Sequence, residues 1–258
     1  MVRRLYILDI KKQKKAFIII PISLFVAIFL FLESNYTPTV FSDQENPRAL
    51  NTGNTDSSSV ALTFNINHGT EKIIPILERL STEEVSATFF VSGEWAERHP
   101  DVLEKIAEAN HEIGMLGYQY KSYVEQEIEQ VRRDLNKAKD TFTKLGYEDV
   151  YLLRAPNGHL NEEIINLAEN QGLKVIHWSI NPNDWKNPGT KKITNHILKN
   201  LSNGDIILLH ASDTVKQTEK ALQQLIPQIK KQKKELLTVS ELITLSETKN
   251  EELQSKKK

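Results

Sequence analysis

Three histidines of this sequence, His68, His159 and His210, each come after an apolar run of the kind that forms a buried strand. The carboxyl ends of parallel strands meet at one edge of a sheet, so these imidazoles could converge on a single rim. Imidazole transfers protons near neutral pH and is a common ligand of zinc and similar divalent metals. Binding of a divalent metal is therefore one chemistry open to the chain, and three unrelated polar loop residues are the simpler interpretation.

The elements that must position these side chains are short apolar runs that alternate with amphipathic segments. We expect strands at Val60–Phe64, Ala87–Val91, Ile113–Leu116, Val150–Leu153, Val175–Ile180, Ile206–Leu209 and, with a weaker pattern, Leu236–Val239. We expect helices at Lys72–Leu80, Pro100–Ala109, Glu125–Leu145, Glu162–Gln171, Thr190–Leu201 and Val215–Lys230. This alternation predicts an α/β fold with a parallel sheet and crossover helices, and periodicity alone does not distinguish an open sheet from a closed one.

Composition narrows the class of protein. The chain has 258 residues and a formal net charge of -1, with 26% charged and 39% hydrophobic residues, which is typical of one globular domain with extensions. The near-neutral balance argues against nucleic acid as the main partner, because phosphate binding needs a basic excess. The sequence has no cysteine, which excludes disulfides, thiolate metal sites and a cysteine nucleophile.

The N-terminal part of the chain predicts a membrane anchor. Residues 1–15 are basic, and residues 16–32 form an apolar run without charge and without a following small-residue cleavage site. We therefore expect an uncleaved transmembrane signal anchor, with a cytoplasmic N-terminus and an extracytoplasmic domain; a cleaved signal peptide is the alternative. A linker (33–58), the domain (59–245) and a polar tail (246–258) complete the predicted organisation.

Residues 61–69 read Ala-Leu-Thr-Phe-Asn-Ile-Asn-His-Gly. This stretch resembles the first motif of the polysaccharide deacetylases (the NodB homology domain), and most closely the sporulation-associated, PdaB-like branch, in which it runs Thr-Phe-Asp-Ile-x-x-Gly. The resemblance covers about residues 59–243 and implies a distorted, incomplete (β/α) barrel. It also implies hydrolysis of the carbon–nitrogen bond of an N-acetyl group on cell-wall glycan such as peptidoglycan, and a role in sporulation.

Members of this family use a divalent metal held by an aspartate and two histidines, with a second aspartate as base and a histidine as acid. The resemblance places the base at Asn65, whose amide cannot accept a proton near neutral pH. It places the metal-binding acid just beyond, where Ile66 and Asn67 stand, and the two histidines at Leu116 and Tyr120. Leucine cannot coordinate a metal, and tyrosine is a poor substitute for imidazole.

The other family motifs keep their scaffold residues. Residues 153–158, Leu-Arg-Ala-Pro-Asn-Gly, resemble an Arg-x-Pro-x-Gly motif whose arginine holds the catalytic aspartate in the family. The positions that the resemblance assigns to catalysis are Asn65 and Asn181 (each replacing an aspartate), Arg154 and the acid histidine His210. The positions that it assigns to substrate binding are Arg154, Pro156, Gly158, Asp184 and Trp185.

Two functions remain open. In the first, the chain is a catalytically silent glycan-binding protein without a metal cofactor, whose pocket reads an anion through Arg154 and stacks a sugar on Trp185. Because Arg154 lacks its family partners, we expect Asp184 or Asp213 to pair with it unless it is free for a ligand. The alternative is an active N-deacetylase that holds a divalent metal on other ligands, namely His68, His159 and His210.

Overall fold

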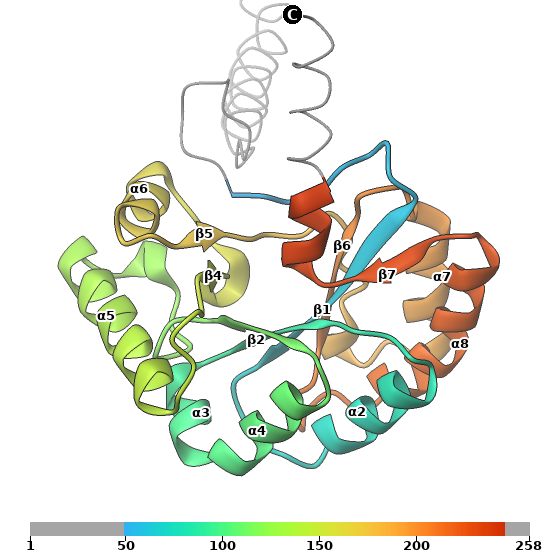
Figure 1. The fold of residues 1–258 in the computed structure, drawn as a ribbon, viewed down its shortest axis with the longest axis horizontal. Helices are drawn as coiled ribbons and strands as arrows, with labels where there is room; N and C mark the ends of the chain where they lie inside the picture. Colours follow the sequence, from blue (N-terminus) through green and yellow to red (C-terminus); the bar gives the residue numbers. More distant parts are fainter. Residues whose placement is uncertain (1–48, 246–258) are drawn as a thin grey trace, which may run out of the picture. The chain divides into compact units, whose positions relative to one another are not determined.

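Seven parallel strands form the centre of the part of the chain that the computed structural model describes, residues 49–245 (Figure 1). The strands are β1 (Ser59–Ile66), β2 (Thr88–Val91), β3 (Glu112–Met115), β4 (Leu152–Leu153), β5 (Lys174–Val175), β6 (Ile206–His210) and β7 (Glu235–Leu237). Their order is β5-β4-β3-β2-β1-β6, and β7 pairs with the amino-terminal end of β1. Since every pair is parallel, the polar residues that follow the strands lie at one edge of the sheet.

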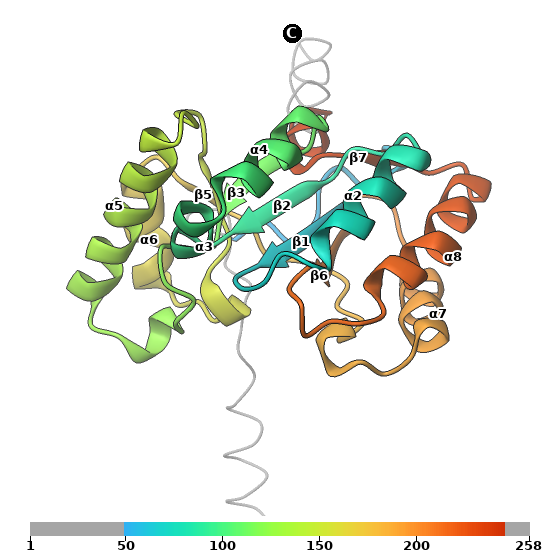
Figure 2. The ribbon, with the colours of Figure 1, turned by 90° about the horizontal axis from the view of Figure 1, so that it is seen from below.

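Helices surround this sheet. They are α2 (Ile73–Thr82), α3 (Gly93–Arg98), α4 (Pro100–Glu108), α5 (Ile128–Lys144), α6 (Glu162–Asn170), α7 (Thr190–Asn200) and α8 (Thr218–Lys231). Figures 1 and 2 show α5 and α6 beside the β4–β5 end of the sheet and α7 and α8 beside β6. In the same views α2, α3 and α4 lie along β1 and β2. Buried apolar residues of the helices and of the strands belong to one core cluster.

β1 pairs with three strands, β2, β6 and β7, and all eight of its residues are buried. Alternate residues reach different cores. Phe64 joins the large core between sheet and helices, where it stacks on Phe89 at a centroid distance of 4.9 Å. Ala61 joins a second core with Phe90 and Leu116. Burial on both faces explains why this strand is a continuous apolar run and not an alternating one.

Side chains fix where several helices begin. Asn161 accepts a backbone N–H at the start of α6, and Glu127 and Gln130 form a capping box at the start of α5. The start of α2 is capped from a distant loop, because the Asp213 carboxylate accepts the backbone N–H groups of residues 70–72 at 2.8–3.1 Å. This contact ties the loop after β6, which follows His210, to the loop after β1, which carries His68.

The helices differ from the predicted ones at their ends, and α3 is absent from the elements that we predicted. The helix expected at Glu125–Leu145 begins at Ile128, after a separate 3-10 turn at Tyr123–Glu125. The helix expected at Val215–Lys230 begins at Thr218. With six residues, α3 is too short to produce a readable periodicity in the sequence.

The strand expected at Val175–Ile180 shows the largest difference, because β5 contains only Lys174 and Val175. Beyond it, Ile176 and Ile180 make isolated bridges and no ladder. The carbonyl oxygens of Ile176 and His177 accept hydrogen bonds from the Arg154 guanidinium instead of pairing with a strand. A buried side chain thus ends β5 where the sequence pattern alone favours its continuation.

The predicted basic segment (1–15), membrane anchor (16–32) and polar tail (246–258) lie outside the described residues, as does most of the predicted linker. Within residues 49–245, the structure contains no helix long and apolar enough to cross a membrane. The anchor therefore stays a prediction.

His111 is a buried structural histidine at the start of β3. Its ring packs beside Phe89 at a centroid distance of 5.1 Å, and neither ring nitrogen has a hydrogen-bond partner among residues 49–245. Burial lowers the pKa of His111 from 6.5 to about 4, so the side chain is neutral at pH 7.

We predict that His111 destabilises the domain in mild acid. Because its pKa is lowered in the folded state, the unfolded chain takes up this proton first as the pH falls. The contribution of His111 is intact above pH 6.5 and is lost toward pH 4, a change of roughly 2–3 kcal/mol in the free energy of unfolding. Urea unfolding between pH 4 and 8 should show this loss in the wild type and in the exposed control His196→Leu. An equal loss in His111→Leu would contradict the assignment.

Candidate functional site

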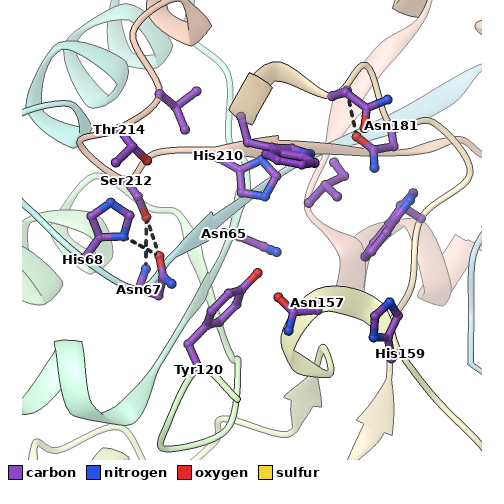
Figure 3. A pocket seen from close by; sticks show the side chains of 15 residues that line it. Asn65, Asn67, His68, Tyr120, Asn157, His159, Asn181, His210, Ser212 and Thr214 are labelled. Carbon is purple, nitrogen blue, oxygen red and sulfur yellow. Dashed lines mark hydrogen bonds between the residues drawn. The ribbon is translucent and has the colours of Figure 1, made fainter. Parts of the chain in front are cut away.

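A pocket of ≈ 500 Å³ opens at the carboxyl ends of the strands, and 15 residues line it (Figure 3). Those that the sequence singled out are Asn65, Asn67, His68, Tyr120, His159, Asn181, Trp185 and His210. Those that it did not assign to the site are Asn157, Trp178, Asn183, Leu208, Ser212, Thr214 and Val215. None of these lining residues is an aspartate, glutamate, lysine or arginine, so amides, imidazoles and hydroxyl groups supply the polar surface.

Most of the residues predicted to bind substrate do not line this pocket. Arg154, Pro156 and Asp184 are buried, and Gly158 is half-buried in the turn after β4. Trp185 does line the pocket, and with 50% of its surface exposed it offers a free aromatic face. The expectation that the Arg154 guanidinium itself faces a ligand is wrong, because that group lies behind the pocket.

Arg154 is fully buried, with 0% of its surface exposed. Its Nη1 donates to Oδ1 of Asn65 at 3.0 Å, and its Nη2 donates to the carbonyl oxygen of His177 at 3.1 Å. Its Nε donates to the carbonyl oxygen of Ile176 at 3.4 Å. The guanidinium carbon lies 4.0 Å from the centroid of the Phe90 ring, which adds a cation–π contact. These contacts hold the guanidinium in one position.

The charge of Arg154 has no carboxylate partner in the described part of the chain. Burial lowers the pKa of Arg154 to about 9, against an opposing effect of Tyr120, so the group stays protonated at neutral pH. Neither carboxylate that we expected to pair with it does so. Asp213 caps α2, and Asp184 is bonded to His210. Neutral oxygen acceptors replace an ion pair at Arg154.

Asp184 positions His210. One carboxylate oxygen, Oδ2, accepts the backbone N–H of His210 and the hydroxyl of Thr218, each at 2.8 Å. The other, Oδ1, lies 2.7 Å from Nδ1 of His210. A carboxylate only accepts, so Nδ1 carries the proton and Nε2 is the nitrogen left for the pocket. His210 is therefore held as one oriented group that can exchange a proton.

Three asparagines around the pocket have their carbonyl oxygens occupied. Oδ1 of Asn65 accepts from Arg154, and Oδ1 of Asn181 accepts the backbone N–H of Asn183 at 2.9 Å. Oδ1 of Asn67 accepts the Ser212 hydroxyl at 2.8 Å and lies 2.8 Å from Nδ1 of His68. Asn181 therefore stabilises its own loop.

Two of the lining asparagines that we missed have an unusual backbone conformation. Asn157 and Asn183 have φ values of 60° and 55°, in the left-handed region that asparagine tolerates better than most residues. Both follow a proline, at Pro156 and Pro182. The Pro-Asn pair is the sequence signal that could have identified these turns as parts of the site wall.

The residues at the implied metal positions do not fit a divalent metal. Leu116 and Ile66 are buried aliphatic side chains of the cores. Tyr120 lines the pocket, but burial raises the pKa of its phenol, against the lowering effects of the Asn157 backbone and Arg154, so it stays protonated at neutral pH. A neutral phenol is a weak ligand, and no step through a metal follows from this donor set.

The alternative metal site is not assembled either. His68, His159 and His210 all line the pocket. Across residues 49–245, however, no group of three or more histidine, cysteine, aspartate or glutamate side chains is placed to hold a metal ion.

Comparisons with known proteins agree with the arrangement of the strands and motifs. A model of the polysaccharide deacetylase family matches residues 52–176. A peptidoglycan-N-acetylglucosamine deacetylase of Bacillus cereus is 30% identical over 83% of this chain and 98% of its own length. The structure of the peptidoglycan N-acetylglucosamine deacetylase Bc1960 matches with a TM-score of 0.73 and 29% identity, over 76% of this chain and 92% of that one. These likenesses support the incomplete, parallel-stranded (β/α) barrel.

A protein without the family's activity is also similar. BA3943, a CE4 family pseudoenzyme from Bacillus anthracis, matches with a TM-score of 0.72 and 26% identity, over 77% of this chain and 69% of that one. A mutant of BA3943 with restored enzymatic activity has the same TM-score, 0.72.

Gly158 tests how tightly the pocket wall is packed. An added Cβ would lie 2.2 Å from the Trp178 ring, and the φ of +74° is unfavourable for other residues. Gly172 has the same φ of +74°, but an added Cβ there meets nothing within 4 Å. We predict that Gly158→Ala lowers the free energy of unfolding by about 1–3 kcal/mol more than Gly172→Ala does. Chemical denaturation of both variants measures this difference. Equal losses of stability would contradict the prediction and would show that the Trp178 ring can move aside at little cost.

Proposed function

The chain belongs to the polysaccharide deacetylase family, and we propose that it binds peptidoglycan in the family's pocket without metal-dependent N-deacetylation. The observation that carries this proposal is the side chain at the base position. Asn65 accepts a hydrogen bond from a protonated arginine, and its neutral amide cannot take a proton from water. The aliphatic Leu116 at a metal position removes a second requirement of the same reaction.

A glycan is the ligand that the lining supports best. Amide, hydroxyl and imidazole groups match the hydroxyl and acetamido groups of a sugar, and the exposed face of Trp185 offers a stacking surface. Lys186 lies over the Trp185 ring at 4.8 Å from its centroid, which holds the ring from one side. Peptidoglycan is the substrate named for the similar Bacillus cereus enzyme, and we carry it over as the proposed ligand.

A second function rests on one observation. His210 is oriented by Asp184 and keeps a free Nε2 at the pocket, so a weak hydrolysis that uses this imidazole as its base is the alternative. The likeness to BA3943 supports a protein without catalytic activity, because BA3943 is a pseudoenzyme of the same family. The sporulation-associated branch and the extracytoplasmic location behind a membrane anchor remain predictions.

We predict that the purified chain does not retain stoichiometric zinc, cobalt or nickel. The physical reason is that the anionic ligand expected at residues 66–67 and the imidazole ligands expected at residues 116 and 120 are absent from the sequence. Elemental analysis after dialysis against each metal measures the content per chain. About one ion per chain that disappears in His68→Ala or His210→Ala, but not in the exposed control His196→Ala, would establish the alternative histidine site and contradict the prediction.

We also predict that Trp185 contributes to glycan binding. Co-sedimentation with insoluble peptidoglycan should show an affinity roughly 5–10-fold lower for Trp185→Ala, since aromatic stacking contributes about 1–1.5 kcal/mol. Tyr151→Ala is the matched control, because Tyr151 is an aromatic residue with 43% exposure that does not line the pocket. If the wild type does not sediment with peptidoglycan, or if both variants bind equally well, this role of the pocket is wrong.

A further inference from the structure

We propose that the pocket binds the carboxylate of an acidic sugar, and that Asn65 presents an N–H donor to it where the family presents a carboxylate base. This inference rests on the proposed glycan-binding function and specifies which glycan group is recognised. It differs from recognition by an exposed arginine, because Arg154 is not accessible and acts only through Asn65.

The orientation of the Asn65 amide follows from its partner. A guanidinium has donors and no acceptors, so the amide must turn its oxygen toward Arg154 and its NH₂ group away from it. In Figure 3 the Asn65 side chain lies between His210 and Tyr120, with its nitrogen directed into the pocket. A carboxylate at this position would offer a lone pair to the pocket. The asparagine offers two N–H groups instead, which reverses the hydrogen-bonding polarity of the site.

Two other asparagine side chains of the pocket are oriented in the same way, with the amide oxygen bonded to the protein. The oxygens of Asn67 and Asn181 are occupied by Ser212 and by the backbone N–H of Asn183. None of the three Nδ2 groups donates to an acceptor within residues 49–245. One pocket therefore contains three amide groups whose acceptors are occupied and whose donors are free, an arrangement that selects a ligand rich in acceptors.

The charge around the pocket favours an anion among such ligands. Arg154 carries a positive charge directly behind Asn65 and has no ion-pair partner in the described chain. No acidic side chain lines the pocket to repel an anion. The nearby carboxylate of Asp184 is fully buried and directed at His210 and Thr218. Hydrogen bonds from N–H groups to a charged oxygen are stronger than those to a neutral one, and a buried cation strengthens them further.

The position of Trp185 indicates that the carboxylate belongs to a sugar. The exposed ring lines the same pocket as the three amides, so a pyranose face on the ring can accompany a carboxylate on the amides. A sugar with a carboxylate on a short ether side chain combines both groups. A peptide carboxylate without a sugar would use only the amides.

Calorimetric titration of the full chain at pH 7 with N-acetylmuramic acid and with its methyl ester tests this inference. The two probes differ in the charge of one group. We expect the free acid to bind about tenfold more tightly than the ester, and acetylalanine, which has a carboxylate and no sugar, to bind more weakly than the acid. Equal binding of acid and ester by the wild type would overturn the proposal. If acetylalanine binds as tightly as the acid, the inference that the carboxylate belongs to a sugar is wrong.

Asn65→Asp is the decisive variant, and it should fold, because an aspartate can accept the same hydrogen bond from Arg154. It places a negative charge in the pocket and neutralises the arginine. We expect it to weaken binding of the free acid more than binding of the ester, and so to lose the preference for the acid. Asn136→Asp, an exposed change on α5 with the same net charge, should keep the preference. An undiminished preference in Asn65→Asp would contradict the role of Asn65. If neither probe nor N-acetylglucosamine binds, the proposed glycan-binding function itself is wrong.

Discussion

The buried charge of Arg154 is the constraint on which the rest of the site depends. A guanidinium cannot be left without acceptors in a protein core, and here its N–H groups reach one side-chain amide and two backbone carbonyl oxygens. The two carbonyl oxygens are those of Ile176 and His177, so the same interaction ends β5 and shapes the chain that carries Trp178 to the pocket wall. The ring of Phe90 covers the guanidinium from the second core. One side chain thus connects β4, β5 and the end of β1.

An amide in place of an acid at Asn65 is compatible with an intact scaffold and with the loss of hydrolysis that we propose. Asparagine keeps the oxygen that Arg154 needs, so the fold around the arginine is preserved, and it removes the negative charge that a base or a metal ligand would supply. Asn181, the other such exchange, has found a local partner in the backbone of Asn183. His210 keeps its orienting carboxylate, Asp184, and is the remaining pocket group arranged for proton transfer in the described chain. The site therefore retains the groups that shape and bind, whereas those that activate water at the family positions have been replaced.

The sequence predicted the parts of this structure that depend on local pattern. The apolar run at Val60–Phe64 identified β1, because that strand is buried on both faces, and the family motifs located Asn65, Tyr120 and His210 at the pocket. It did not predict where β5 ends, because the cause is a side chain more than twenty residues away in the chain. From the sequence we also expected that Arg154 could face a ligand. Its burial depends on packing against Phe90 and Trp178, and the periodicity of the sequence does not show this packing. Asn157 and Asn183 were missed since their place in the wall follows from a left-handed backbone conformation.

Acetate release from N-acetylated peptidoglycan tests the central claim most directly. The measurement uses the full chain with added zinc, cobalt or nickel, beside the similar Bacillus cereus deacetylase as a positive control. We predict no release above the protein-free background, because an amide stands at the expected base position and the aliphatic Leu116 and the phenol of Tyr120 stand where the metal-binding histidines are expected. Metal-dependent release that is lost in His210→Ala would contradict this account and would show that the pocket has kept the hydrolytic activity of its family.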